Sequence, residues 1–386
     1  MKKLLYLSPL WPKRSGISEY SEGLLLGLRK LYDITIYVDG YVPENSDINK
    51  NYKIVKKQSD LNFKEFDEII YNFGNNPDFH DYMYDMLMEH PGYIILHDFV
   101  LFYLTVGHYQ NQGKLLQKIY EMAGPTGIQV VKDSLKKNHS RNLLEHKDIA
   151  DLLPLNKEVI DASKGIFVHS EYARQLVRNI NPEKKVKVIE AYMKPLEEDE
   201  EENFLRKKYN IAPDATIISS FGMIAPTKQN ELISKAVNFY NGSHTNKLYY
   251  VMCGEGTYVD SYLSEYIKKT GFLSNKEFAS AITDCDIVMN LRYPYNGETS
   301  ATLIQTMKKG KACMVTDIGS FSEIPDDCVL KISKEITEEE LCEKFEIIMN
   351  CQKELIEKSR VYANGERFAV DTISETIKAF LEGDKE

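Results

Sequence analysis

Residues 290–300 contain the densest group of side chains able to bind a phosphate. Arg292 follows a predicted strand, and Thr299 and Ser300 stand where a helix is expected to begin. A guanidinium grips phosphate through two parallel hydrogen bonds, and the unpaired N–H groups of a helix N-terminus attract anions. Glu298 adds a like charge, so its carboxylate fits better on the hydroxyls of a sugar attached to that phosphate. A helix-capping role for Glu298 is the simpler alternative.

Two further segments could also bind anions. Gly16 lies in a turn before a predicted helix, where glycine allows close backbone approach and the helix offers free N–H groups. Lys228 follows Gly222 by six residues in a predicted strand–helix loop, and its ammonium is a suitable point charge for phosphate. The alternatives are an ordinary loop at Gly16 and a solvated lysine at 228.

Hydroxyl recognition is predicted after two other strands. Asn75 lies in Asn72-Phe73-Gly74-Asn75-Asn76, whose amides could hydrogen-bond sugar hydroxyls or simply form a turn. His97 and Asp98 follow the next strand, where a neutral imidazole beside a carboxylate suits polar recognition or proton transfer. A purely structural histidine is the alternative.

The elements expected to position these residues alternate between strands and helices. Unbroken apolar runs predict strands covered on both faces, and apolar residues with helical spacing predict helices. Strands are expected at 4–8, 34–38, 68–73, 93–97, 165–169, 216–222, 248–253, 287–291 and 312–316. Helices are expected at 18–31 with Ser18 as the N-cap, and at 230–240, 258–270, 275–283, 300–309, 338–359 and 369–381. This rhythm predicts an α/β protein with two doubly wound domains facing across a cleft, with ligands beyond the carboxyl ends of the strands.

Composition limits the class of protein. The chain has 386 residues, 43% hydrophobic and 27% charged, with a net charge of −10, which favours a globular two-domain protein and disfavours nucleic-acid binding. Residues 4–10 are interpreted as a strand and not a signal peptide, and no apolar run is long enough to span a membrane. Six consecutive acids at 197–202 indicate a linker. The six cysteines form no C-x-x-C pair, so we expect free thiols in the cytoplasm.

Taken in order, these segments resemble glycosyltransferase family 4, whose members have the GT-B fold. The likeness covers residues 4–380 and is most specific in the segment from Asn290 to Ser300. It is carried by Ser15-Gly16-Ile17-Ser18-Glu19-Tyr20, Phe73-Gly74-Asn75-Asn76, Leu96-His97-Asp98, Val168-His169-Ser170, Phe221-Gly222 through Lys228, Asn290-Leu291-Arg292-Tyr293-Pro294 with Gly297-Glu298-Thr299-Ser300, and Gly310 through Val315-Thr316-Asp317, Gly319 and Glu323-Ile324-Pro325.

The resemblance implies two Rossmann-like domains and a final helix. It implies an acceptor-binding domain at 1–193, a nucleotide-sugar-binding domain at 203–365 and a helix within 366–386 that crosses back to the first domain. It also implies sugar transfer with retention of configuration, from a UDP- or GDP-sugar to a glycan, glycolipid or glycoprotein, usually without a metal and with no cofactor beyond the donor. A bacterial surface polysaccharide or glycoprotein pathway is the implied setting.

Site residues are carried over by position. The resemblance implies that His97 and Glu298 hold the donor sugar at the reaction centre. It implies donor-phosphate contacts for Gly16, Lys228, Arg292, Thr299 and Ser300, donor sugar or nucleotide contacts for Gly222, Gly297 and Thr306, and acceptor or cleft positions for Asn75, Asp98 and His169. The chain departs from the family at Met223, where an arginine is frequent, and at Thr306, where the second glutamate of E-x7-E falls.

Several alternatives stay open at the level of sequence. The two departures allow a degenerate glycosyltransferase that acts as a non-catalytic binding or scaffold partner, and a sugar-nucleotide epimerase of similar architecture is a third reading. Residues 114–147 hold seven basic residues among interleaved leucines, so peripheral contact with the inner face of a membrane is one hypothesis and a solvated helix face is the other.

Overall fold

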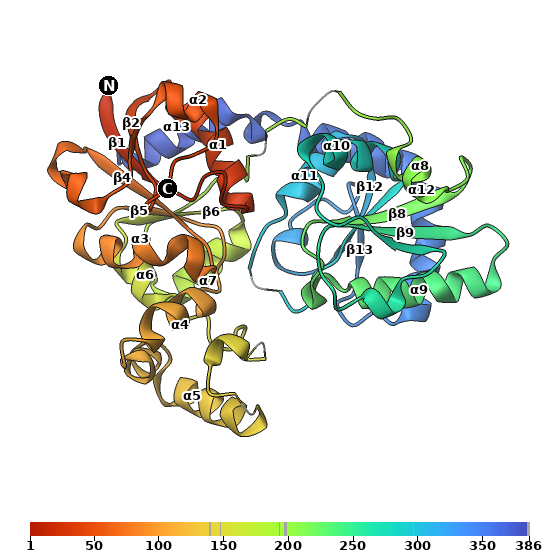
Figure 1. The fold of residues 1–386 in the computed structure, drawn as a ribbon, viewed down its shortest axis with the longest axis horizontal. Coiled ribbons are helices and arrows are strands. Elements are labelled where there is room, and N and C mark those ends of the chain that lie inside the picture. The colour runs from red at the N-terminus through yellow and green to blue at the C-terminus, as the bar shows by residue number, and fades with distance from the viewer. Residues whose placement is uncertain (139, 147, 193, 197–198, 296, 384–386) are drawn as a thin grey trace. The chain divides into compact units, whose positions relative to one another are not determined.

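The computed structural model describes residues 1–383 except residues 139, 147, 193, 197, 198 and 296. The described chain forms two compact units (Figure 1). Unit 1 contains Met1–Tyr192 together with residues 297–299 and 367–383, and unit 2 contains residues 194–295 and Ser300–Glu366. Both units are α/β, as the sequence predicts.

A parallel sheet forms the centre of unit 1. Its strands are β1 (Lys2–Leu7), β2 (Tyr32–Tyr37), β3 (Lys53–Val55), β4 (Glu68–Phe73), β5 (Tyr93–Leu96), β6 (Gly165–Val168) and β7 (Val186–Val188). The order in the described part of the sheet is β3-β2-β1-β4-β5-β6-β7, with every adjacent pair parallel. The order reverses between β1 and β4, and ligands of doubly wound sheets bind beyond the carboxyl ends at such a point.

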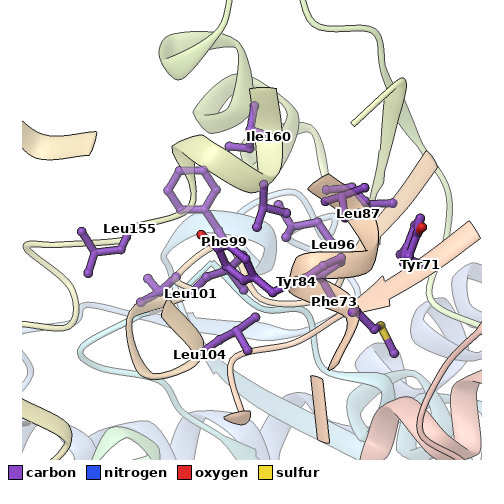
Figure 2. Packing of buried hydrophobic residues seen from close by; sticks show 14 of the residues in the cluster. Tyr71, Phe73, Tyr84, Leu87, Leu96, Phe99, Leu101, Leu104, Leu155 and Ile160 are labelled. Carbon is purple, nitrogen blue, oxygen red and sulfur yellow. The ribbon is translucent and has the colours of Figure 1, made fainter. Parts of the chain in front are cut away.

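The helices of unit 1 cover both faces of this sheet. They are α1 (Gly16–Leu28), α2 (Ser46–Asn51), α3 (Pro77–Glu89), α4 (Phe102–Gln110), α5 (Leu115–Lys137), α6 (Lys157–Ala162), α7 (Glu171–Ile180) and α13 (Val370–Leu381). Side chains from β4, β5, α3 and the segment after β5 pack into one core, where Tyr71, Phe73, Tyr84, Leu96 and Leu104 lie together (Figure 2). This core fixes the strand ends that carry the candidate site.

The last helix packs on the first. Glycine at position 27 of α1 brings the two helices together, because a side chain there would overlap Ser374 and would lie 2.8 Å from the carbonyl oxygen of Val370. The ammonium of Lys30 also contacts the carboxylate of Asp371 at 2.6 Å. The chain therefore returns to unit 1 after residue 366.

Helices α4 and α5 form an insertion between β5 and β6, and in Figure 1 α5 lies farther from the sheet than α4 does. The helical run of α5 is interrupted at Gly124, which has a φ of 62°, and Pro125 follows. Glycine tolerates this left-handed backbone and proline cannot continue the hydrogen-bond ladder, so α5 bends there.

Unit 2 repeats the α/β pattern. Its strands are β8 (Thr216–Phe221), β9 (Leu248–Cys253), β10 (Ile267–Lys269), β11 (Ile287–Asn290), β12 (Ala312–Thr316) and β13 (Leu330–Ile332), all parallel in the order β10-β9-β8-β11-β12-β13 among the described residues. Its helices are α8 (Phe204–Tyr209), α9 (Asn230–Ser243), α10 (Asn275–Asp284), α11 (Ala301–Lys308) and α12 (Glu338–Ala363). Reciprocal capping boxes start α10 at Ser274 and α12 at Thr337.

Two predictions about local structure are wrong. The stretch 258–270 is not a helix: it contains a 3-10 turn at Asp260–Tyr262 and then β10, where Ile267 is buried and pairs with Tyr250. The N-cap of α1 is Ser15 and not Ser18, since the Ser15 hydroxyl accepts the N–H of Ile17. The other predicted strands and helices are present, with ends that shift by a few residues.

The described residues also bear on the predictions for the cysteines and for membrane-spanning helices. The six cysteines are free thiols, as predicted, and five of them are buried. Over the described ranges, no helix combines the length and apolar character needed to cross a membrane.

Candidate functional site

A chain of hydrogen-bonding groups crosses the carboxyl ends of β4, β5 and β6. Nε2 of His97 lies 3.2 Å from Oδ1 of Asn72, and Nδ1 of His97 lies 3.1 Å from Nε2 of His169. Nδ1 of His169 in turn lies 3.1 Å from the carbonyl oxygen of Ile189, which follows β7. The sheet order places these strands side by side, so it brings together His97 and His169, which are 72 residues apart in sequence.

The loop after β4 meets the loop after β5 at Gly74. A side chain at Gly74 would lie 2.9 Å from Nε2 of His80 and 3.2 Å from Oδ2 of Asp98. The backbone N–H of Asn75 donates to that same Oδ2 at 2.9 Å. The side-chain oxygen of Asn75 accepts the N–H of Tyr103 at 2.8 Å. The side-chain amide predicted to bind sugar hydroxyls therefore holds the start of α4 in this structure.

The pKa values of Asp98 and of three histidines at this edge are shifted in the direction that favours the neutral form. Burial raises the pKa of Asp98 to about 6, against the lowering effect of the Asn75 N–H, and the charge of Glu298 adds to the rise. Burial also lowers the pKa of His80 and of His169 to about 4. For His97 the pKa falls well below the ordinary value, because of burial first and then the neighbouring His169 and His80.

Glu298 belongs to unit 1 in the structure, although its sequence neighbours lie in unit 2. Residues 297–299 group with unit 1, where a side chain at Gly297 would lie 2.7 Å from Cβ of Phe99. Gly297 also has a φ of 84°, so glycine is required there for both space and backbone. Burial first, and then the negative charge of Glu298, raise the pKa of both Asp98 and Asp151.

The N-terminus of α1 offers a further polar surface. Gly16 is the first residue of the helix, is exposed, and has no atom within 4 Å of where a Cβ would stand. The hydroxyl of Ser18 is buried and donates to the carbonyl oxygen of Lys13 at 2.7 Å, which closes the turn before the helix. The geometry leaves room for a ligand group beside Gly16.

In unit 2, a lysine lies directly over a glycine at the end of β8. Nζ of Lys228 donates to the carbonyl oxygen of Phe221 at 2.7 Å, and a side chain at Gly222 would lie 2.8 Å from Nζ. Gly222 is exposed and has a φ of 87°, and its carbonyl oxygen occupies the space that a side chain at Gly254 would need. A partly exposed ammonium above a bare backbone is suited to an anion that approaches closely.

The loops after β8 and β11 are joined next to this lysine. The N–H of Tyr293 donates to the carbonyl oxygen of Thr227 at 2.8 Å, which brings Arg292 to the same edge as Lys228. Arg292 is buried, and its guanidinium donates to the carbonyl oxygen of Leu291 at 2.7 Å. The structure therefore places the two predicted cations of unit 2 on adjoining loops.

The start of α11 lies beyond the same strand. Ser300 is the N-cap: its hydroxyl accepts the N–H of Leu303 and donates to Oδ1 of Asn290 at 3.0 Å. The cap occupies the N–H of Leu303, so the amides of Ala301 and Thr302 are the ones that could face an anion. Thr306 differs from the prediction for it, because it is fully buried and its hydroxyl donates to the carbonyl oxygen of Leu303 at 2.8 Å.

Residues that the sequence analysis did not single out complete both edges. Tyr20 packs edge-on against the rings of His97 and His169, with centroids 4.7 and 5.2 Å away. The carbonyl of Ile189 and the glycine at 254 leave no side-chain signature in the sequence, whereas the order of β4, β5 and β6 could have linked Asn72 to both histidines. Unit 1 thus presents two histidines, an amide and carboxylates, and unit 2 presents cations and backbone amides.

Comparison with solved structures identifies the architecture. A sucrose-phosphate synthase from Thermosynechococcus elongatus superposes with a TM-score of 0.66 over 99% of this chain and 98% of its own, at 12% identity. Anabaena HepE in complex with UDP-glucose gives a TM-score of 0.64 over 99% of this chain and 100% of its own, at 14% identity. The chain has the GT-B fold. WaaG, a glycosyltransferase of lipopolysaccharide biosynthesis, matches this GT-B chain with a TM-score of 0.63 at 11% identity, covering 99% and 100%.

No protein-family model matches the sequence, and no curated protein matches it either. Identities of 11–14% show a shared GT-B fold, so the chemistry of this GT-B protein has to be argued from its own residues.

Proposed function

We propose that the protein is a retaining glycosyltransferase of the family 4 type that transfers a sugar from a UDP- or GDP-sugar to a glycan, glycolipid or glycoprotein. The observation that carries this proposal is the ammonium of Lys228 above Gly222 at the end of β8. A diphosphate is the anion that suits a cation, a bare backbone and a helix N-terminus on adjoining loops. The HepE structures solved with UDP and with UDP-glucose support the choice of donor.

In this proposal unit 2 stabilises the leaving group. As the bond between the sugar's anomeric carbon and the phosphate oxygen breaks, negative charge grows on the diphosphate. Lys228, Arg292 and the amides after Ser300 face that charge with fixed positive ends, which is the arrangement that lowers a barrier most effectively. The protein's own cations take this role, so we expect transfer to persist in the presence of a chelator.

The reacting sugar is assigned to His97 and Glu298. The neutral imidazole and the carboxylate orient hydroxyl groups of the sugar, and the acceptor oxygen forms the new bond on the face that the diphosphate leaves. The departing phosphate oxygen accepts the proton of the acceptor hydroxyl. Asp98, His169 and the backbone of Asn75 line the acceptor side, and the acceptor belongs to bacterial surface polysaccharide or glycoprotein synthesis.

Titration calorimetry with UDP and with GDP tests the donor site directly. Loss of a hydrogen bond to a charged group costs about 1.5–3 kcal/mol, so Lys228→Ala should weaken binding of the preferred nucleotide by about 10- to 150-fold. Lys235→Ala is the matched control, because Lys235 lies on α9 in an exposed ion pair with Glu231. Equal affinity of the Lys228→Ala protein and the wild type would contradict the assignment.

A non-catalytic GT-B protein is the second candidate. Two observations favour it: Met223 is 66% exposed where the family often has an arginine, and Thr306 is buried where the family has a glutamate. Both changes remove charged contacts to the nucleotide. The same calorimetry decides between the two functions, because a folded protein that binds neither nucleotide at millimolar concentration supports the scaffold reading.

The insertion of unit 1 could hold the protein at an anionic membrane surface. An apolar groove of about 470 Å³ runs along α5, lined by Leu115, Leu116, Val131, Leu135, Lys136, Asn138, Ser140, Arg141 and Leu143. Of the seven basic residues predicted for this contact, Lys118, Lys136 and Lys137 make ion pairs with acids, and Lys147 lies outside the described residues. We propose peripheral contact with the membrane through the groove and the remaining basic residues Lys114, Lys132 and Arg141.

Vesicle co-sedimentation tests this contact. We expect binding to vesicles of phosphatidylglycerol and phosphatidylcholine, and loss of binding in Leu116→Glu, since Leu116 is 58% exposed at the groove. Val361→Glu is the control, because Val361 is 74% exposed on α12 of unit 2. Equal sedimentation of Leu116→Glu and the wild type would contradict the proposal.

A further inference from the structure

The two histidines at the carboxyl ends of β5 and β6 form a chain of hydrogen-bond contacts. When both rings are neutral, they carry too few protons to satisfy every contact in this chain. Three contacts run in sequence from Asn72 through His97 and His169 to Ile189, and each needs one proton between its two atoms. The four ring nitrogens of two neutral imidazoles carry two protons. One of the three contacts therefore faces lone pair against lone pair.

Both ends of this chain are acceptors. The carbonyl oxygen of Ile189 cannot donate, so Nδ1 of His169 must carry a proton to satisfy that contact. The amide of Asn72 is oriented by its nitrogen, which donates to the carbonyl oxygen of Leu7 at 3.0 Å, and by the hydroxyl of Tyr6, which donates to Oδ1 at 3.3 Å. Rotation of the Asn72 amide would only move the mismatch to Leu7, so no amide flip removes it.

The contact between Nε2 of His97 and Oδ1 of Asn72 is the one that can lack a proton at the lowest cost. Oδ1 of Asn72 still accepts from Tyr6 when that contact is empty, and His97 is partly exposed whereas His169 is buried. With a proton on Nδ1 of His169, its Nε2 is an acceptor, and Nδ1 of His97 must then be the donor. His169 thus fixes the tautomer of His97 and leaves Nε2 of His97 bare.

We propose that His169 is a positioning residue that holds His97 as the Nδ1–H tautomer, and that the two hydrogen-bonded rings together take up only one proton, at Nε2 of His97. That proton fills the third contact, so all three hydrogen bonds are satisfied in the cationic state. A second proton would leave Nε2 of His169 and Nδ1 of His97 donor against donor, so the folded pair binds only one.

The groups packed around His97 and His169 affect how readily the pair takes up its proton. Tyr20 from α1 packs against both rings in T-shaped geometry, with interplanar angles of 79° to His97 and 66° to His169. Asp98 follows His97 in the chain, and its carboxylate accepts the backbone N–H of Asn75 at 2.9 Å. Burial lowers the pKa of both histidines, and the neighbouring His80 from α3 lowers that of His97 further. The pair is therefore neutral in the free protein near pH 7.

The test is long-range 1H–15N correlation of the 15N-histidine-labelled full chain between pH 8 and pH 4, with circular dichroism to follow folding. His97→Gln and His169→Gln assign the two rings. We expect both rings as Nδ1–H tautomers at pH 8, and one common titration step on acidification. An Nε2–H tautomer at His169, or two separate steps of a full proton each in the folded protein, would overturn the proposal.

Two variants at position 169 separate positioning from structural support. In His169→Gln the amide oxygen can still accept from Nδ1 of His97, so we expect His97 to keep its Nδ1–H tautomer but to titrate alone. In His169→Leu that preference should be lost. An unchanged tautomer in His169→Leu would contradict the positioning role. The measurement uses no nucleotide, so its outcome is independent of whether the protein transfers sugars.

Discussion

The carboxylate of Asp98 accepts the backbone N–H of Asn75 at 2.9 Å, which locks the loop after β5 to the loop after β4. This contact favours the ionised acid, yet burial dominates and raises the pKa of Asp98 to about 6 from 3.8. The folded protein therefore binds a proton in a pH range where the unfolded chain has released it. Stability contributed by this group should fall as pH rises from about 4 to about 6.

Replacement of Asp98 tests that linkage. Asp98→Asn keeps an oxygen for the Asn75 N–H and cannot ionise, so the variant should gain up to about 3 kcal/mol relative to wild type between pH 4 and pH 7. Urea unfolding at both pH values measures the gain as a difference between the two proteins. A constant difference across this range would show that Asp98 titrates normally.

The buried His80 should have the opposite dependence on pH. Its Nδ1 lies 3.0 Å from the carbonyl oxygen of Asn72, and burial lowers its pKa to about 4 from 6.5. The unfolded chain binds a proton between these values and the folded chain does not, so stability falls as pH drops from 6.5 to 4. His80→Asn should be less acid-sensitive by about 3 kcal/mol over that interval, as urea unfolding at pH 7 and pH 4.5 would show.

The contact between α1 and α13 depends on the absence of a side chain at Gly27. Gly27→Ala would overlap Ser374 and should destabilise the protein by about 1–3 kcal/mol. Gly242→Ala on α9 is the control, since no atom lies within 4 Å of its Cβ position, and it should be neutral or stabilising by up to about 1 kcal/mol. Thermal unfolding of both variants measures the contrast, and equal losses would contradict the packing argument.

A buried ion pair supports unit 2. Arg206 contacts Oδ1 of Asp284 at 2.5 Å, and the Asp284 side chain is only 4% exposed. Arg206→Ala leaves that carboxylate without its charged partner and should cost about 3–5 kcal/mol. Lys207→Ala on the same helix removes an exposed pair with Glu201 and should change stability by less than about 1 kcal/mol. Guanidinium unfolding measures both, and a small effect of Arg206→Ala would indicate that water reaches Asp284.

The fold was predictable because its strands are mostly apolar runs, such as residues 68–73 and 248–253, whose bounds the structure matches. The stretch 258–270 was not predictable in the same way. Its tyrosines at 258, 262 and 266 repeat every four residues, but Ile267 pairs with Tyr250 of β9 and is fully buried. Tertiary pairing overrode a local pattern.

The candidate site was predictable where strand ends carry polar side chains, as at His97 and His169. What joins these two histidines to the rest of the fold is the carbonyl of Ile189 and the amide of Asn72, whose roles follow from strand order and loop course. The position of Thr306 also escaped prediction, because its spacing from Glu298 fits the motif while its hydroxyl is buried in its own helix. Spacing alone does not report which way a helix faces.

We expect sugar transfer by this protein to depend on Lys228. The most direct measurement incubates the protein with radiolabelled UDP- and GDP-sugars and a panel of glycan, glycolipid and glycoprotein acceptors, alongside Lys228→Ala and Lys235→Ala. We predict label in an acceptor with retained configuration, a loss of at least about tenfold in Lys228→Ala, and no loss in Lys235→Ala. No transfer from any donor by folded protein, or equal transfer by Lys228→Ala, would contradict the account.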